Sequence, residues 1–128
     1  MRYISAEELL MLHARVVDAT GGSHGVRDTG LLQSIIVKPS AQFESNKLYP
    51  SIFKKAAVLL EAIANYHVFV DGNKRTAFMA AAYFLHINGY ELVATNRAVE
   101  KTVLAVVTKH TNLDALEAWI KKHAEKAV

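Results

Sequence analysis

Apolar residues recur at helical spacing along most of the chain, and turn-forming residues separate the apolar stretches. The segment 51–66 is apolar on most of its sides, which predicts a buried central helix. Strong strand alternation is absent, although GYELVA at 89–94 is suited to a brief extended segment. The pattern predicts an all-α fold, a compact bundle of about six helices around a central helix-loop-helix pair. The expected helices cover roughly residues 5–20, 29–37, 50–66, 73–88, 95–110 and 111–126.

Capping and helix-breaking residues support most of these boundaries. Ser5 and Glu8 have the spacing of a capping box before the first helix. Pro39 ends the second helix, and Pro50 suits the first turn of the third. Further caps are expected at Asp28 or Thr29, at Thr95 or Asn96, and at Thr111 with Asp114. The connection 38–50 is long for so small a protein, and long connections in compact domains are often functional.

Composition narrows the class of protein. A chain of 128 residues with 52% hydrophobic and 21% charged residues fits one folded domain, taken as 1–128. Its apolar runs are shorter than the roughly 18 residues of a membrane span. The N-terminal MRYISAEELL has acids where a signal peptide is apolar, so the cytoplasm is the expected location. The lack of cysteine excludes disulfides and thiolate zinc sites.

The net charge of +3 favours acidic partners only mildly. Lys121, Lys122 and Lys126 lie where cations complement the dipole at the end of the last expected helix. Aromatic residues do not interleave with these lysines, so they do not resemble a nucleic-acid-binding patch.

The stretch HVFVDGNKR, residues 67–75, concentrates ionisable side chains between two apolar helices. The first amides of the helix that starts near Asn73 have no intrahelical partners, and Gly72 lets an anion approach them closely. Lys74 and Arg75 place two cations at a helix N-terminus, where they are unfavourable unless an anion compensates them. A phosphate group fits this arrangement.

Two further side chains of the stretch extend this chemistry. Asp71 together with phosphate oxygens forms a usual ligand set for Mg2+. The neutral imidazole of His67 can accept a proton from an incoming hydroxyl group. The whole set suits transfer of a phosphoryl or nucleotidyl group to an alcohol. A purely structural interpretation stays open, in which His67 caps the preceding helix, Asp71 caps the following one and the cations are solvated.

The same residues resemble the motif of the Fic/Doc superfamily, which is His-x-Phe-x-Asp/Glu-Gly-Asn, then Gly or Lys, then Arg. The matching positions are His67, Phe69, Asp71, Gly72, Asn73, Lys74 and Arg75. Other segments, such as GVRDTGLLQSII and RTAFMAAAYFLHINGY, are similar to the Doc (death-on-curing) branch. The resemblance therefore covers nearly the whole chain, and it implies the helical Fic/Doc fold.

Two positions separate this chain from the pattern of AMP-transferring Fic proteins. That pattern has a glycine where Lys74 stands and a second arginine where Phe78 stands. Both differences are typical of the Doc branch, and the resemblance implies ATP bound in the reversed sense, with its γ-phosphate at His67. The implied function is that of a toxin with protein kinase activity, which phosphorylates a Ser/Thr hydroxyl of translation elongation factor Tu and arrests translation.

The resemblance also assigns roles to residues. His67 is implied to be the general base, and Asp71 is implied to hold Mg2+ and help orient His67. The implied contacts to the phosphates of ATP come from Gly72, Asn73, Lys74 and Arg75. Phe69 is expected to anchor the loop in the core. The loop 38–49 stands where the family has its target-positioning flap.

Two residues outside the motif are interpreted structurally. Arg27 lies in a glycine-containing loop, where pairing with Asp28 or a neighbouring acid is expected ahead of contact with the nucleotide. His13 lies near the apolar stripe of the first helix and is expected to be a packing histidine.

Membership of the Doc branch implies a Phd-like antitoxin partner, whose C-terminal segment folds over the toxin. The chain shows no convincing internal inhibitory Ser/Thr-x-x-x-Glu helix, so an external antitoxin is expected. DNA is expected to be contacted only indirectly, through that antitoxin. Two alternatives stay open: a Fic-type AMP transferase acting on a protein hydroxyl, and a non-catalytic helical binding module or antitoxin-dependent corepressor.

Overall fold

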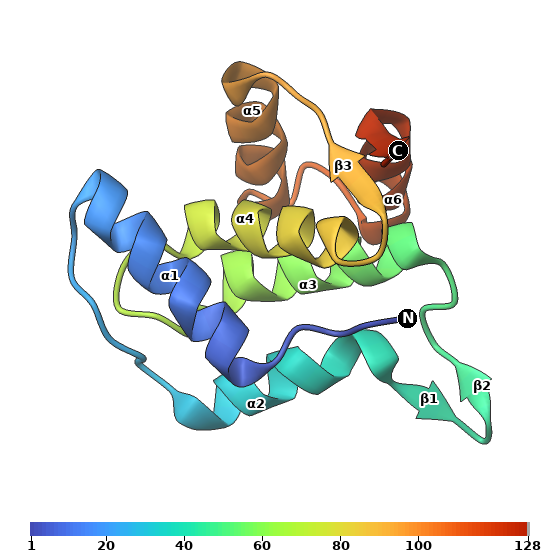
Figure 1. Cartoon of the computed structure of the whole chain (residues 1–128), viewed down its shortest axis with the longest axis horizontal. Helices are drawn as coiled ribbons and strands as arrows, with labels where there is room; N and C mark the ends of the chain where they lie inside the picture. The colour runs from blue at the N-terminus through green and yellow to red at the C-terminus, as the bar shows by residue number, and fades with distance from the viewer. Residues whose placement is uncertain (128) are drawn as a thin grey trace.

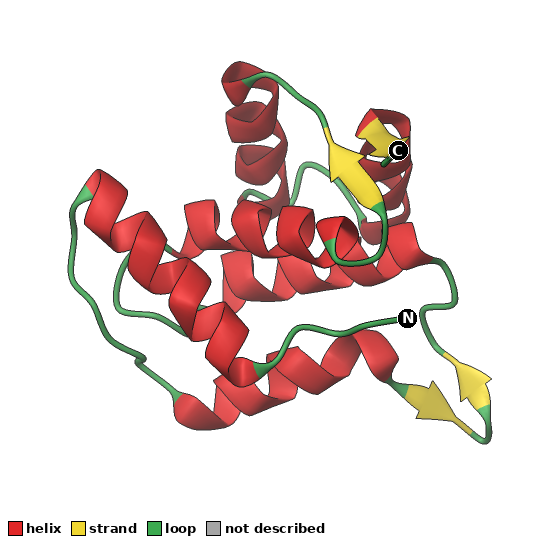
Figure 2. Cartoon of the chain, in the orientation of Figure 1, coloured by secondary structure: helices red, strands yellow, loops and turns green. Residues whose placement is uncertain are grey.

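Helices make up most of the chain in the computed structural model, which describes residues 1–127 (Figure 1, Figure 2). The α-helices within this range are α1 Ala6–Thr20, α2 Thr29–Val37, α3 Ile52–Tyr66, α4 Asn73–His86, α5 Asn96–Val107 and α6 Leu113–His123. The predicted all-α bundle of about six helices is confirmed. None of the helices between residues 1 and 127 combines the length and the apolarity that crossing a membrane requires.

Two small antiparallel strand pairs accompany the helices (Figure 2). The first is a hairpin of β1 Gln42–Phe43 and β2 Asn46–Lys47, which follows the short 3-10 helix η1 Lys38–Ser40. In the second, β3 Tyr90–Leu92 pairs with β4 Ala124–Lys126 in the register Tyr90 to Lys126 and Leu92 to Ala124. The expected extended segment at 89–94 is thus confirmed. The connection 38–50 contains the short 3-10 helix and the hairpin.

The core is built around α3 and α4, which lie side by side at the centre of the molecule (Figure 1). The continuous apolar run 56–60 in α3 is buried, as the sequence predicts. Because a helix that is apolar all round needs partners on every side, α3 also contacts α2, α5 and α6. This central pair fixes the turn 67–72 at one end of the molecule.

Several predicted helix caps are confirmed. Ser5 accepts a hydrogen bond from the N–H of Glu8, and the Glu8 carboxylate accepts one from the N–H of Ser5, each at 3.1 Å. Asp28 caps α2 through the N–H of Leu31. Thr95 caps α5. Such caps satisfy amides that have no partner inside the helix.

The predicted starts of α3 and α6 and the predicted end of α6 are wrong. Pro50 lies before α3 rather than in its first turn, because Ser51 is the cap. Asn112, not Thr111, caps α6. The last helix ends at His123 instead of continuing to Lys126, because residues 124–126 pair with β3. Lys126 therefore does not complement the dipole of α6.

The fifth helix also stops earlier than expected, at Val107 instead of near residue 110. Lys109 adopts a left-handed backbone conformation, with φ of 62°, which no helix can continue through. The connection to α6 begins there.

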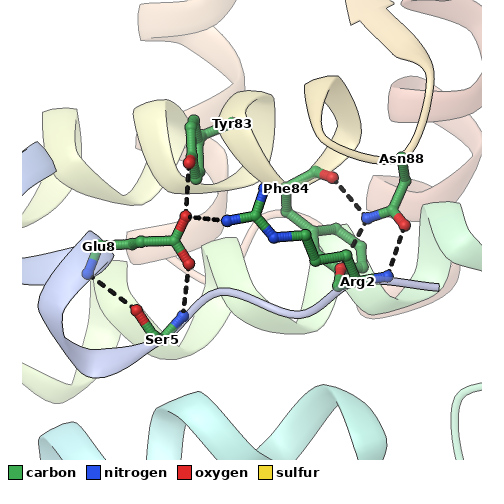
Figure 3. Close-up of polar contacts among 6 residues, drawn as sticks. All are labelled: Arg2, Ser5, Glu8, Tyr83, Phe84 and Asn88. Atoms are coloured by element: carbon green, nitrogen blue, oxygen red, sulfur yellow. Dashed lines mark hydrogen bonds and ion pairs between the residues drawn. The ribbon is translucent and has the colours of Figure 1, made fainter.

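The N-terminal segment is tied to the C-terminal half of α4 by a polar cluster (Figure 3). The Glu8 carboxylate accepts hydrogen bonds from the Tyr83 hydroxyl and, at 2.8 Å, from the Arg2 guanidinium. The Asn88 amide exchanges two hydrogen bonds of 2.8 Å with the backbone of Arg2. These contacts close α1 against α4 at the end opposite to the turn 67–72.

The Tyr83 hydroxyl holds the pKa of the Glu8 carboxyl below its ordinary value of 4.5, and the N–H of Ser5 and the charge of Arg2 act in the same direction. Because the pKa is lower in the folded protein, this stabilisation is complete above about pH 4.5 and is lost as pH falls through the lowered value. Glu8→Gln should therefore reduce the acid dependence of the free energy of unfolding. At neutral pH it should cost about 1 kcal/mol.

Urea unfolding at neutral pH and near pH 3 measures this effect. Glu7→Gln is the matched control, because Glu7 lies in the same helical turn and forms no side-chain hydrogen bond within residues 1–127. Equal acid dependence in Glu8→Gln, Glu7→Gln and the wild type would refute the role of Glu8.

Candidate active site

The ionisable residues of the motif converge on the turn 67–72 and the first turn of α4. His67, Asp71, Lys74 and Arg75 are exposed. Phe69 is 1% exposed and anchors the turn in the core, as predicted. The polar groups therefore face solvent from a rigid apolar support.

His67 occupies the C-cap position of α3 with a left-handed backbone, φ 52° and ψ 48°. Histidine adopts this conformation more readily than most residues. The change of direction ends α3 and presents the imidazole outward. His67 therefore does cap α3, as the structural interpretation held, but through its backbone conformation, because the ring forms no hydrogen bond within residues 1–127. A free ring nitrogen is what a general base needs.

Asn73 holds the turn together from inside. Its side-chain oxygen accepts a hydrogen bond of 3.0 Å from the N–H of Phe69, and its side-chain nitrogen donates one of 2.9 Å to the carbonyl of Phe69. Both ends of the amide are thus used within the turn. The side chain of Asn73 is therefore committed to the turn, and its backbone N–H remains for an anion.

Arg27 fixes the same turn from the loop before α2. Its guanidinium donates to the carbonyls of His67 and Tyr66, at 2.5 and 3.1 Å. Its backbone N–H donates to the carbonyl of Val68 at 2.8 Å, beside an isolated bridge between Val26 and Phe69. The expected ion pair of Arg27 with Asp28 or a neighbouring acid is wrong, because its guanidinium donates to the carbonyls at the end of α3 instead.

The helix α1 supports the turn from a third side. His13 is 3% exposed and its ring stacks on Phe69, with centroids 3.8 Å apart. Its Nε2 lies 2.7 Å from the carbonyl oxygen of Asp71 and must carry the proton, because a carbonyl only accepts. The prediction of a packing histidine is confirmed.

Asp71 does not cap α4, because the cap is Gly72, which has no side chain. One carboxylate oxygen of Asp71 instead accepts the N–H of Ser23 at 2.9 Å. The first helical hydrogen bond of α4 runs from Thr76 to the carbonyl of Gly72. The N–H groups of residues 73–75 therefore have no acceptor within residues 1–127, which is the arrangement that an anion-binding helix start requires.

The turn offers a metal ion one carboxylate, that of Asp71. Within residues 1–127 the structure has no group of three or more His, Asp or Glu side chains able to hold a metal. Asp71 is exposed and uses one oxygen for Ser23, so the other faces solvent. This donor set fits Mg2+ only in the mode where phosphate oxygens and water complete the coordination.

The fold and the site agree with known proteins. The family model described as the Fic/DOC family matches residues 3–85, and this chain belongs to that family. The chain is 43% identical over 112 residues to a protein named Toxin Doc from Mycolicibacterium smegmatis, with 85% of each chain covered. It is 36% identical over 103 residues to Protein kinase doc of Escherichia phage P1, covering 80% of this chain and 81% of the relative. The predicted placement in the Doc branch is confirmed.

The sequence did not predict the contacts that Ser23 and Arg27 make with this site. Ser23 and Arg27 lie about 40 to 50 residues before their partners. Ser23 donates its backbone N–H to the Asp71 carboxylate, and Arg27 donates its guanidinium to backbone carbonyls. The glycine-containing loop between α1 and α2 was the only signal that these residues had a special conformation.

Loss of the Asn73 amide should loosen the turn. Asn73→Ala removes two hydrogen bonds and leaves the backbone groups of Phe69 without partners in a part-buried place, which should cost about 2 kcal/mol. Asn73→Asp keeps the acceptor for the N–H of Phe69 and should cost less. Amide hydrogen exchange at Phe69 and thermal unfolding measure both effects. Unchanged exchange at Phe69 in Asn73→Ala would contradict the assigned role.

Proposed function

We propose that this protein is a Doc-type toxin and protein kinase that transfers the γ-phosphate of ATP to a Ser/Thr hydroxyl of a translation factor similar to elongation factor Tu, and so arrests translation. The observation that carries the proposal is that the imidazole of His67 and the N–H groups at the start of α4 lie at the two ends of one short turn and have no hydrogen-bond partner within residues 1–127. The relatives named Toxin Doc and Protein kinase doc support a toxin with kinase activity.

The start of α4 binds the phosphates in this proposal. The N–H groups of residues 73–75 point out of the helix, and the helix dipole adds partial positive charge. Lys74 and Arg75 neutralise the phosphate oxygens. Gly72, with φ of 76°, gives the chain its tight entry into the helix without a side chain in the way.

The transfer step needs a base and an acceptor hydroxyl. His67 accepts the proton of the target hydroxyl, whose oxygen forms a bond to the γ-phosphorus while the bond to the bridging oxygen of ADP breaks. Asp71 would hold Mg2+ together with the phosphate oxygens, and the ion would supply positive charge that offsets the charge of the phosphates. The Arg27 contact to the carbonyl of His67 keeps the imidazole in place for this step.

The γ-phosphate is favoured over the α-phosphate by two side chains. Lys74 and Phe78 replace the glycine and the second arginine of AMP-transferring Fic proteins. Phe78 is half-buried and apolar, so this part of α4 cannot clamp an outer phosphate as an arginine would. AMP transfer is the second candidate and differs in which phosphate reaches His67.

The protein target would meet two separate features of the surface. The hairpin of β1 and β2, which carries the exposed Phe43, lies at the end of α3 opposite to His67 (Figure 1). The 15 residues of α3 span about 22 Å at 1.5 Å per residue. If the hairpin positions the target as the family flap does, it contacts the target far from the reacting hydroxyl. A folded protein substrate meets this requirement better than a short peptide.

The remaining parts of the proposal concern regulation. A toxin of this class requires an antitoxin, proposed here to be a Phd-like protein with an inhibitory C-terminal segment. Contact with DNA would then occur only through the antitoxin, and the cytoplasm is the proposed location. A corepressor role is compatible with catalysis, whereas a purely non-catalytic binding module would not need a free imidazole at His67.

Transfer from ATP labelled on either the γ- or the α-phosphate tests the proposal directly. The protein, Mg2+ and elongation factor Tu should yield a product carrying γ-label only. His67→Ala should lower the rate by at least about 100-fold, because proton removal contributes 10²–10⁴ to such reactions. His86→Ala is the matched control, because His86 is exposed on the last turn of α4 and pairs with Glu91.

Each other outcome has a distinct meaning. Transfer of α-label would establish the AMP transferase. Transfer that His67→Ala leaves intact would remove His67 from the chemistry. If elongation factor Tu takes no label but another protein of a cell lysate takes γ-label, the kinase is retained and the target is corrected.

A further inference from the structure

Lys55 places a charged side chain inside the core. It lies on α3 with 0% of its surface exposed, next to the buried apolar run 56–60. Burying an ammonium group costs free energy, because the group has three donors that need partners. Within residues 1–127 no carboxylate forms an ion pair with Lys55. An apolar side chain would fill the same space at a lower cost, so packing alone does not explain this lysine.

The ammonium group of Lys55 reaches the segment that leads into the β1–β2 hairpin. Its Nζ donates a hydrogen bond of 2.8 Å to the carbonyl oxygen of Pro39, which belongs to η1. The same Nζ lies 5.6 Å from the centre of the Tyr3 ring, a distance at which cation–π attraction acts. Pro39 is itself buried, so the contact joins η1 to the core away from water.

A second contact ties η1 to the other end of α3. Lys38, the residue before Pro39, donates from its Nζ to the Tyr66 hydroxyl at 2.7 Å. Tyr66 directly precedes His67 in the chain. Lys55 and Tyr66 lie about 16 Å apart along α3, at 1.5 Å per residue. The short helix η1 is therefore held at two separate places along one rigid helix.

The hairpin depends on its base for its position. Residues 42–48 are all exposed, and in Figure 1 the hairpin extends away from the helices. Its two-residue loop, Glu44 and Ser45, has φ values of 48° and 70°, the geometry of a tight hairpin turn. The N–H of Leu48 donates to the carbonyl of Ala41 at 3.0 Å and closes the base. The hairpin is thus a short unit whose direction is set where the chain leaves η1 and where it enters α3.

We infer that Lys55 and Lys38 are positioning residues, which fix the hairpin relative to His67 and so set where a protein target lies when its hydroxyl meets the imidazole. This inference rests on the proposed function, in which the hairpin contacts the target, and it adds the groups that orient the hairpin. The same helix, α3, carries His67 at one end and holds η1 through Lys55 and Tyr66. A fixed hairpin therefore means a fixed distance between the target-binding segment and the base.

Removing the ammonium group tests the inference. Lys55→Met keeps an unbranched side chain with an apolar stem, so the core stays filled while the hydrogen bond to Pro39 is lost. A hairpin that is no longer fixed must be ordered each time a target binds, which weakens binding and leaves the transfer step unchanged. The KM for elongation factor Tu should rise about fivefold or more, while kcat and the KM for ATP stay within about twofold of the wild type.

Three further variants separate this role from a general effect on stability. Tyr66→Phe removes the hydroxyl that Lys38 contacts and keeps the ring, so it should raise the same KM by a smaller factor. Lys38→Met breaks the same contact and, with Tyr66→Phe, carries the test if Lys55→Met does not fold. Lys54→Met is the matched control, because Lys54 is the neighbouring residue on α3 and its ammonium group pairs with Asp114 of α6 at 2.7 Å. It should leave the KM for elongation factor Tu unchanged.

Amide hydrogen exchange reads out the hairpin without any substrate. At its base, the N–H of Ala41 donates to the carbonyl of Lys38 at 3.1 Å, and the N–H of Leu48 donates to the carbonyl of Ala41. Both amides should exchange about fivefold faster or more in Lys55→Met, and at the wild-type rate in Lys54→Met.

The failure of this inference and that of the proposed function give different results. A wild-type KM for elongation factor Tu in a folded Lys55→Met would overturn the inference, as would an equal rise in the KM for ATP. If γ-label is transferred but the two amides exchange at the wild-type rate in Lys55→Met, the kinase stands and the inference fails. If the amides exchange faster in Lys55→Met but the wild type transfers no label, the fixing of the hairpin by Lys55 is supported and the proposed function fails.

Discussion

The double hydrogen bond between the Asn73 side chain and the backbone of Phe69 is the constraint on which the site depends. It closes a turn of few residues between two central helices, and it sets where α4 begins. Arg27 and His13 then hold the same turn from the loop before α2 and from α1. Because three elements fix one short segment, the exposed His67 ring stands on a rigid support, which is the requirement for a positioned base.

Some polar groups of the site are bonded to the turn, and others remain available to a ligand. Hydrogen bonds to backbone atoms of the turn come from the side chains of Asn73, Arg27 and His13. The imidazole of His67, one oxygen of Asp71 and the first amides of α4 are left for a ligand.

Local signals made most of the fold predictable. Helix starts such as those at Ser5, Asp28 and Thr95 depend on side chains within a few residues, which a sequence displays directly. The pairing of residues 124–126 with β3 depends on tertiary neighbours, and helical spacing there gave the wrong answer. The motif marked the candidate reacting groups, and the family resemblance supplied the choice between phosphoryl and nucleotidyl transfer. The role of Arg27 was not predictable, because its acceptors are backbone carbonyls that no side-chain pattern marks.

The proposed kinase activity requires the turn 67–72 to present the terminal phosphate of ATP to His67. A crystal structure of the protein with Mg2+ and a non-hydrolysable ATP analogue tests it most directly. We expect the γ-phosphate on the N–H groups of residues 73–75, facing the His67 ring. An α-phosphate in that place, with the β- and γ-phosphates running toward Phe78, would contradict it.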